Sequence, residues 1–291
     1  MRVLVTGAGG QVGAETVRLG GADVVGLGRP APGSRPGEGL DVTDRGAVWE
    51  AVARVRPDVV LNAAAFTAVD RAESESGAAF AVNRGGAAHV AEACARAGIP
   101  LVHLSTDYVF DGAQNGPYAP SDPVSPLNVY GASKAAGEAA VRARLDRHVI
   151  LRTAWVFASH GRNFVRTILR LAGERDRLAV VADQWGHPTW AGDVSRAALA
   201  AATLAAEGRA PWGTHHVAGA PLATWHDLAV AVVEAAPGVA VPVDAVPSSA
   251  YPTAAARPPR VALELGWDAL GLETPRWRPA VAAVVRELLR G

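Results

Sequence analysis

The segment Val3-Leu4-Val5-Thr6-Gly7-Ala8-Gly9-Gly10-Gln11-Val12-Gly13 places Gly7, Gly10 and Gly13 three residues apart, directly after a short apolar run. The apolar run is typical of a buried strand, and a helical pattern from Ala14 to Leu19 follows the glycines. In this setting Gly7 permits a tight turn, Gly10 lets the backbone approach a pyrophosphate and Gly13 allows close packing of the helix, whose N-terminus adds oriented N–H donors for an anion. The spacing alone would also fit a merely structural turn, but the strand before it and the helix after it favour dinucleotide binding.

Short strand-like runs alternate with alanine-rich helical patterns in the first half of the chain. Because these runs are continuously apolar, they indicate strands buried on both faces, as in a parallel sheet with crossover helices. We therefore predict an α/β fold, a doubly wound parallel sheet of the Rossmann type, with a smaller C-terminal substrate-binding region. The predicted strands are Val3 to Thr6, Asp23 to Leu27, Asp58 to Leu61, Pro100 to Leu104 and Val149 to Leu151.

The pattern loosens after Trp155, where only scattered strand-like runs such as Val180-Val181 and His216-Val217 occur. We expect residues 1–155 to form a dinucleotide-binding domain, to which later segments return. Residues 156–291 are expected to be mainly a substrate-binding region.

The composition argues against several kinds of partner. The 28 basic and 28 acidic side chains cancel, so no net charge attracts nucleic acid or an anionic membrane. The longest apolar stretch, Ala197 to Ala206, has about half the length of a membrane-spanning helix. The single cysteine, Cys94, cannot form an intrachain disulfide, which indicates a reducing compartment. With no secretory signal before the glycines, we expect a cytoplasmic protein that binds neither nucleic acid nor membrane.

Gly28-Arg29 follow the second predicted strand, where an enzyme that prefers NAD usually has an acid for the ribose 2′-hydroxyl. An arginine would instead pair with a 2′-phosphate, which favours NADPH and leaves NADH as the alternative cofactor. Arg29 also fits a solvated loop residue, and Arg35 is then the next candidate for the phosphate. Further along, Asp41 can reach the adenine, whereas Asp44 fits a helix cap.

Tyr130 and Lys134 are four residues apart in a segment that opens a helix, so they share one face. A nearby ammonium favours the phenolate and is expected to lower the tyrosine pKa from about 10 toward neutrality. Tyr130 can then protonate a carbonyl oxygen as hydride arrives. Lys134 is the only lysine in the chain. A compact ammonium can donate to ribose hydroxyls and relay protons in a way that a guanidinium cannot.

Ser105 and Thr106 end the fourth predicted strand, and ligands of open α/β sheets bind at the carboxyl ends of strands. Their hydroxyls can hydrogen-bond a substrate oxygen and steady Tyr130. They would also fit residues that end a strand for local reasons, so this role depends on the pair of Tyr130 and Lys134.

With these residues in place, the sequence resembles the extended short-chain dehydrogenase/reductase superfamily and, within it, the dTDP-4-dehydrorhamnose reductase family. The resemblance runs through most of the chain. The segments that carry it are Gly10 to Gly13, Arg56 to Val60, Asn62 to Asp70, Ser105 to Phe110, Pro126 to Gly131, Arg152 to Phe157, Asn163-Phe164 and Asp183-Gln184. The sequence departs at Gly28-Arg29, where some relatives carry an acid, and at Ala256 to Arg260, which only partly follows the family's arginine-proline pattern.

The resemblance implies a catalytic set of Thr106, Tyr130 and Lys134. With the glycine turn and Arg29 included, the residues expected to contact the cofactor are Gly7, Gly10, Gln11, Val12, Gly13, Arg29, Asp41, Val42, Ala63, Ala64, Ala65, Thr67, Leu104, Tyr130 and Lys134. The residues expected to contact the substrate are Ser105, Thr106, Asp107, Trp155, Asn163, Gln184 and Arg257. Trp155 would lie against the sugar, although it also fits a core aromatic, and the last three would be nucleotide contacts.

The activity implied by the resemblance is NADPH-dependent reduction of the 4-keto group of a dTDP-4-keto-6-deoxyhexose in deoxysugar biosynthesis. Two alternatives stay open, another nucleotide-sugar enzyme such as an epimerase, which retains NAD, and a non-catalytic NADP-binding regulatory subunit. A dehydratase is disfavoured because relatives of that kind typically show Thr-Asp-Glu, whereas Tyr108 follows Asp107 here.

Two groups of side chains could suggest a metal site, the acidic Asp70, Glu73 and Glu75 and the pair His215-His216. Neither has strong zinc-ligand spacing, so we expect no metal. The sequence leaves the oligomeric state open, with a homodimer as the form to test.

Overall fold

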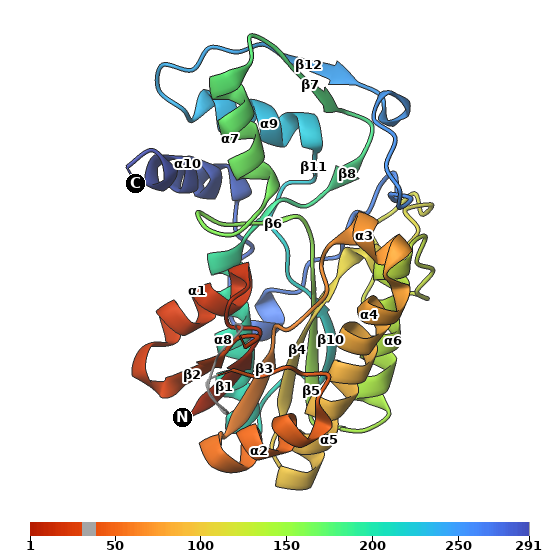
Figure 1. Ribbon diagram of the computed structural model, residues 1–291, viewed down its shortest axis with the longest axis vertical. Helices are drawn as coiled ribbons and strands as arrows, with labels where there is room; N and C mark the ends of the chain where they lie inside the picture. Colours follow the sequence, from red (N-terminus) through yellow and green to blue (C-terminus); the bar gives the residue numbers. More distant parts are fainter. Residues whose placement is uncertain (31–38, 291) are drawn as a thin grey trace.

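The structure, a computed structural model, describes residues 1–30 and 39–290 and is built around a six-stranded parallel sheet (Figure 1). Its strands are β1 (Val3–Thr6), β2 (Val24–Leu27), β3 (Val59–Asn62), β4 (Leu101–Thr106), β5 (His148–Thr153) and β10 (Gly213–His216). Their order across the sheet is β10-β5-β4-β3-β1-β2, and all neighbours are parallel. The strand order reverses between β1 and β3, which is the point where ligands bind in open α/β sheets.

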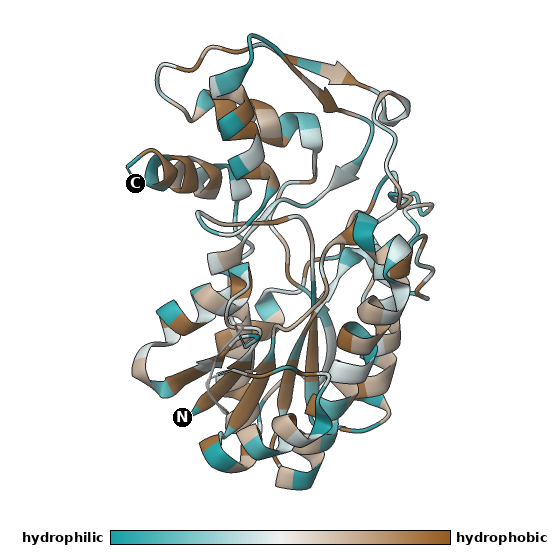
Figure 2. Ribbon diagram, in the orientation of Figure 1, coloured by the Kyte–Doolittle hydropathy of each residue, from teal (hydrophilic) through white to brown (hydrophobic). Residues whose placement is uncertain are grey.

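Helices cover both faces of this sheet. The helices α1 (Gln11–Gly20) and α8 (Ala191–Ala206) pack on one face, and α2 (Arg45–Val55), α5 (Ala87–Ala97) and α6 (Val129–Arg142) lie on the other. The strands are therefore enclosed, and they appear as brown apolar ribbons in Figure 2. The predicted Rossmann-type α/β fold is confirmed by this architecture.

Two elements from the second half of the chain belong to this sheet layer. The helix α8 packs against β3, β4 and β5 through buried alanines, whose small side chains let the helix approach the sheet closely. The strand β10 pairs with β5 at the sheet edge, with His216 beside Arg152. His216, part of the strand-like run that the sequence showed after Trp155, is thus the last residue of a strand of the central sheet.

A separate lobe lies beyond the carboxyl ends of the central strands (Figure 1). Its apolar core is formed by α7 (Phe164–Glu174), α9 (Trp225–Glu234), α10 (Trp277–Leu288) and the parallel pair β7 (Leu178–Val181) and β12 (Val243–Val246). Two further strand pairs connect it to the sheet layer. They are β6 (Val156–Phe157) with β9 (Thr189–Trp190), and β8 (Trp185–Gly186) with β11 (Ala223–Thr224).

Short helical segments fill the crossover between β3 and α5. They are α3 (Val69–Ser74), α4 (Ser76–Phe80) and a π-helical turn over Ala81–Gly86. Among the helices of the described part of the chain, none is long and apolar enough to cross a membrane.

Candidate active site

At Gly7 and Gly13, the turn between β1 and α1 leaves no room for a side chain. Gly7 has a φ of 70°, and a Cβ there would lie 2.5 Å from the Ala64 nitrogen. A Cβ at Gly13 would lie 2.2 Å from the Gly7 carbonyl oxygen. Gly10 begins α1 without a side-chain cap, so the N–H groups of the first turn are available to an anion. The backbone at the reversal of the sheet therefore fits the pyrophosphate of a dinucleotide.

Arg29 and Asp41 lie together after β2. Arg29 is 82% exposed, and its Nε is 3.9 Å from Asp41 Oδ2. Asp41 accepts hydrogen bonds from the backbone N–H and the hydroxyl of Thr43, and the backbone bond is the main cause that lowers the pKa of this carboxyl. Val42 is buried, with its carbonyl oxygen 3.0 Å from a ring nitrogen of His89. Arg35 lies outside the described residues.

Tyr130, Lys134 and the end of β4 come together in the buried layer between α6 and the sheet. The Asn128 carboxamide oxygen caps α6 by accepting from Gly131 N at 2.8 Å. Lys134 is 2% exposed, and its Nζ donates to the Leu104 carbonyl oxygen at 2.6 Å. The Thr106 hydroxyl neighbours the Tyr130 phenol.

The predicted lowering of the Tyr130 pKa is wrong for this structure. Burial raises the pKa of Tyr130 to about 12, and the neighbouring Thr106 hydroxyl opposes that shift only in part. The Lys134 ammonium, which donates to the Leu104 carbonyl, is not among the groups that shift this pKa. Burial also lowers the pKa of Lys134 to about 8, against the opposing charge of Glu138. Tyr130 is thus a protonated group at neutral pH, which suits a proton donor.

Asp107 is buried directly after Thr106, whose hydroxyl donates to its carboxylate at 3.1 Å. Burial raises the pKa of Asp107 to about 7 despite this hydrogen bond. Ser105 is also buried, and its hydroxyl forms no hydrogen bond with the described residues. Its hydroxyl neighbours Glu138 and helps lower the pKa of that carboxyl, which pairs with the buried Arg152.

The segment that follows β3 contains Ala63, Ala64, Ala65 and Thr67. It is fixed by Asn83, whose carboxamide oxygen accepts from Phe66 N at 2.8 Å and whose nitrogen donates to Phe66 O at 3.1 Å. The same nitrogen donates to the Ser133 hydroxyl on α6 at 2.8 Å.

Sequence reasoning missed Asn83. The available signal was an asparagine in an alanine-rich stretch, shortly before two glycines. Gly137 makes its close approach to α6 possible, since a Cβ at Gly137 would lie 2.2 Å from the Asn83 carbonyl oxygen.

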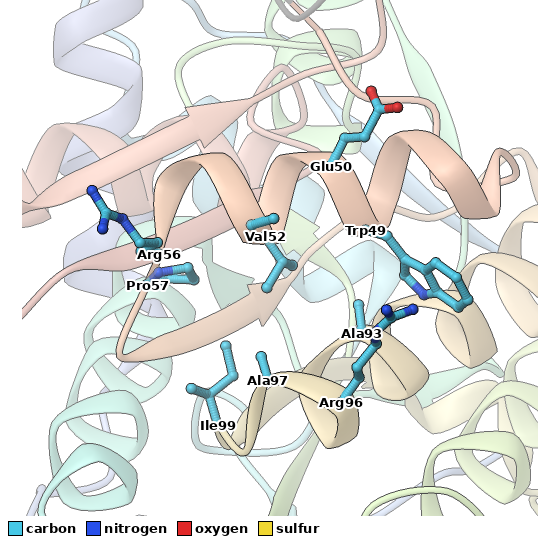
Figure 3. Close-up of a pocket in the computed structure, with 10 residues that line it drawn as sticks. Trp49, Glu50, Val52, Arg56, Pro57, Ala93, Arg96, Ala97 and Ile99 are labelled. Atoms are coloured by element: carbon cyan, nitrogen blue, oxygen red, sulfur yellow. The ribbon is translucent and has the colours of Figure 1, made fainter.

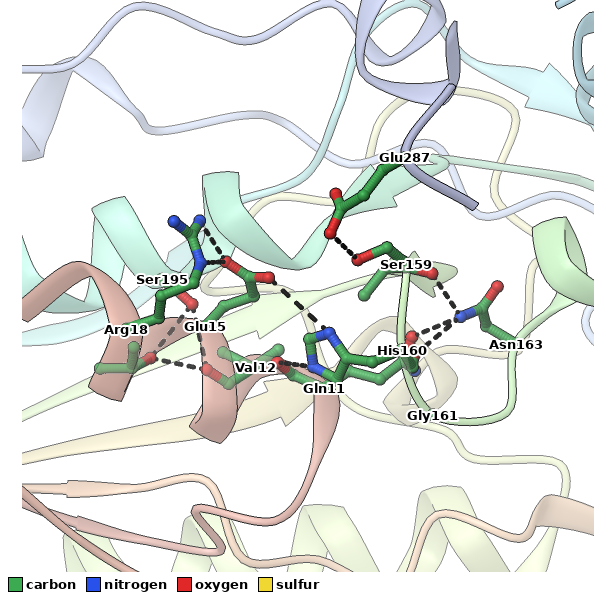
Figure 4. Close-up of polar contacts among 12 residues, drawn as sticks. Gln11, Val12, Glu15, Arg18, Ser159, His160, Gly161, Asn163, Ser195 and Glu287 are labelled. Carbon is green, nitrogen blue, oxygen red and sulfur yellow. Dashed lines mark hydrogen bonds and ion pairs between the residues drawn. The ribbon is translucent and has the colours of Figure 1, made fainter. Parts of the chain in front are cut away.

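Asn163 is linked to the start of α1 and not to the Tyr130 region (Figure 4). Its carboxamide nitrogen donates to Gln11 Oε1 at 2.8 Å, while its oxygen caps α7 by accepting from Arg166 N. His160 Nε2 lies 3.3 Å from the Gln11 carbonyl oxygen. The Val12 carbonyl oxygen accepts from the Ser195 hydroxyl of α8 at 3.1 Å. The bonds from Asn163 and His160 tie the start of α1 to the segment that leads into α7 of the lobe, whereas the Ser195 bond joins α1 to α8 within the sheet layer.

The remaining predicted substrate residues contact three different parts of the structure. Gln184 donates to the Ser248 hydroxyl at 3.1 Å. Arg257 is 16% exposed and forms an ion pair of 2.8 Å with Asp70 on α3. The ring of Trp155 stacks on that of Trp225, with the centroids 3.6 Å apart.

A cavity of about 540 Å³ lies between α2 and α5 (Figure 3). Its lining includes Trp49, Val52, Arg96 and Ile99, and none of the predicted site residues. Within the described ranges, no group of three or more His, Cys, Asp or Glu side chains is placed to hold a metal ion.

Comparison with known proteins agrees with this arrangement. Residues 1–290 match the family described as the RmlD substrate binding domain. A dTDP-4-dehydrorhamnose reductase of Burkholderia thailandensis is 44% identical over an alignment of 309 positions, which covers 99% of this chain and 99% of the relative. The chain belongs to the dTDP-4-dehydrorhamnose reductase family. The family resemblance predicted from the sequence is therefore confirmed.

Solved structures extend the comparison with this family. The crystal structure of a dTDP-4-dehydrorhamnose reductase from Bacillus anthracis in complex with NADP superposes with a TM-score of 0.88 and 32% identity. The match covers 98% of this chain and 99% of the Bacillus anthracis chain. A UDP-glucose 4-epimerase from Thermus thermophilus in complex with NAD superposes with a TM-score of 0.81 and 26% identity. That match covers 100% of this chain and 99% of the epimerase chain. The fold is thus shared with enzymes of both reaction types.

Proposed function

We propose that this protein is an NADPH-dependent reductase of the 4-keto group of a dTDP-4-keto-6-deoxyhexose, in deoxysugar biosynthesis. The observation that carries the proposal is the buried set of Thr106, Tyr130 and Lys134 near the end of β4, on the same carboxyl edge of the sheet as a glycine turn that fits a dinucleotide. Membership of the reductase family supports the same activity.

The nicotinamide, when bound, supplies the hydride for the sugar C4 carbon. The chain's own residues then act on the oxygen. Tyr130 is held protonated by burial, and its hydroxyl donates a proton to the alkoxide that forms, which is a far stronger base than a phenolate. Thr106 neighbours this phenol and orients the reacting oxygen by hydrogen bonding. Lys134 is anchored by the Leu104 carbonyl, and its ammonium would hold the ribose hydroxyls of the bound cofactor.

The other predicted residues define the surroundings of this set. We propose that Gln11, Val12 and the segment from Ala63 to Thr67 line the cofactor, with Arg29 and Asp41 at its adenosine end. Asp107 and Trp155 would face the sugar, and Gln184 and Arg257 would serve the nucleotide. For Asn163 we propose a supporting role, because its carboxamide already bonds Gln11. The buried Ser105 hydroxyl forms no hydrogen bond with the described residues, so it would be available to the substrate oxygen.

The deciding experiment is oxidation of NADPH by the purified protein in the presence of dTDP-4-keto-6-deoxysugars, with the product identified by NMR. Turnover that requires the sugar is expected. No turnover with any such sugar would overturn the proposal and favour a regulatory NADP-binding subunit. An epimerase is the second candidate, because the fold matches that of the UDP-glucose 4-epimerase. NAD that remains bound through purification would favour it.

We place the reaction in the cytoplasm, where Cys94 would stay reduced and sugar nucleotides are made. A homodimer is the assembly to test, and light scattering of the purified protein measures it directly.

A further inference from the structure

Trp155 has a backbone conformation that a residue with a side chain rarely adopts. Its φ is 43°, and Arg56 is the other non-glycine residue with a positive φ in the described part of the chain. Trp155 lies two residues beyond Thr153, which pairs with Thr106 across β4 and β5. Such strain persists only where the surroundings hold it, and it is often found at functional sites.

Two neighbouring residues, Trp225 and Gly186, accommodate the ring of Trp155. The ring lies parallel to that of Trp225, with an interplanar angle of 5° and centroids 3.6 Å apart. On β8, Gly186 leaves the space that the indole fills, since a Cβ there would lie 2.4 Å from the ring atom Cε2 of Trp155. Both tryptophans remain partly exposed, unlike a pair in a sealed core.

Trp225 is itself held firmly. It is the first residue of α9, after a capping box in which the Thr224 hydroxyl accepts from Asp227 N at 3.0 Å and the Asp227 carboxylate accepts from Thr224 N at 2.8 Å. The Phe164 ring of α7 contacts the Trp225 ring at 4.7 Å between centroids. The stack therefore connects a residue at the end of the central sheet to the helices of the lobe.

We propose that Trp225 is a positioning residue for sugar binding, which fixes the ring of Trp155 at the place where it meets the sugar. This inference rests on the proposed function. Trp225 acts through Trp155, so its loss should weaken binding of the sugar nucleotide and leave NADPH binding intact. The Phe164 and Thr224 contacts make the ring position of Trp155 depend on α7 and α9.

The test replaces Trp225 by Leu, which removes the aromatic face, and by Phe, which keeps part of it. For Trp225→Leu we expect KM for the keto-sugar to rise about three- to tenfold, with Kd for NADPH unchanged, and for Trp225→Phe a smaller rise. The stacked indoles should also give an exciton couplet in far-ultraviolet circular dichroism, which Trp225→Leu removes. Trp212→Leu is the matched control, because Trp212 is 38% exposed and lies against Arg147, outside the stack.

Gly186→Ala provides a second variant if Trp225→Leu does not fold. The added methyl must displace the Trp155 ring, so it should raise KM for the sugar while Trp225 is still present. An unchanged KM for the sugar in either folded variant overturns the inference but not the proposed function. So does an equal loss of affinity for the sugar and for NADPH. An unsubstituted protein that reduces no keto-sugar overturns the proposed function and the inference together.

Discussion

The Nζ atom of Lys134 donates a 2.6 Å hydrogen bond to the backbone carbonyl of Leu104, so the only lysine of the chain is tied to the strand that carries Thr106. This bond fixes the ammonium one helical turn from Tyr130.

Replacing Tyr130 by Phe should lower kcat by about two to four orders of magnitude, because a positioned proton donor is lost. NADPH binding should be nearly unchanged, since the ring remains. Steady-state kinetics and a fluorescence titration with NADPH measure the two effects. Tyr118→Phe is the control, because it removes a hydroxyl that bonds Asp111 away from the site. Near-normal turnover of Tyr130→Phe would exclude Tyr130 as the acid.

Lys134→Arg should lower kcat about a hundredfold although it keeps the charge. The planar guanidinium cannot place a donor at both the Leu104 carbonyl and a ribose hydroxyl as the compact ammonium can, and small misplacements at a reacting centre cost about this much. Single-turnover kinetics at saturating NADPH would measure it. A variant with wild-type turnover would show that charge alone is what Lys134 contributes.

The pH dependence of kcat/KM should show a loss of activity as the pH rises through about 8. Burial lowers the pKa of Lys134 to that value, so its active charged form is present below it and is lost above it. Tyr130, with a pKa raised to about 12, stays protonated throughout this range. A pH–rate profile of the free enzyme checks this, and a flat profile up to pH values of about 10 would contradict it.

Arg29→Ala should weaken the use of NADPH more than that of NADH, because only the 2′-phosphate offers an anion to the guanidinium. The differential loss expected for a charged hydrogen bond is about 1 to 3 kcal/mol, and at 82% exposure it should fall near the lower end, about fivefold in relative kcat/KM. Kinetics with both cofactors measure the ratio. If both change equally, or neither does, Arg29 is a solvated loop residue and Arg35 becomes the candidate.

Gly13→Ala should abolish cofactor binding and lower the melting temperature, because its methyl group would lie 2.2 Å from the Gly7 carbonyl oxygen, in backbone that cannot give way. Gly173→Ala on α7 is the matched control. Apart from the backbone of its own helix and its chain neighbours, no atom lies within 4 Å of a Cβ at that position, and the helix should gain about 0.5 to 1 kcal/mol. Calorimetry of both variants, with and without NADPH, tests the prediction. A Gly13→Ala protein that melts and binds like the wild type would refute the tight turn.

The sequence by itself determined the features that follow local rules. A strand, a glycine turn and a helix in succession predict a nucleotide-binding crossover, and a spacing of four residues puts Tyr130 and Lys134 on one helical face. The continuous apolar runs predicted a parallel sheet. Each of these depends on neighbours within about two helical turns, where backbone geometry and side-chain period decide the outcome.

The tertiary structure alone decided how distant segments meet and what burial does to their chemistry. Trp155 and Trp225 are far apart in sequence, and so are Asn163 and Gln11, and no local pattern specifies either contact. Ser105 and Thr106 are adjacent in sequence, yet the Ser105 hydroxyl lies near Glu138 and the Thr106 hydroxyl lies near the Tyr130 phenol. The sequence predicted a lowered pKa for Tyr130, whereas the structure raises it. Desolvation depends on every element packed around the phenol, and the helical spacing identifies only one neighbour, Lys134.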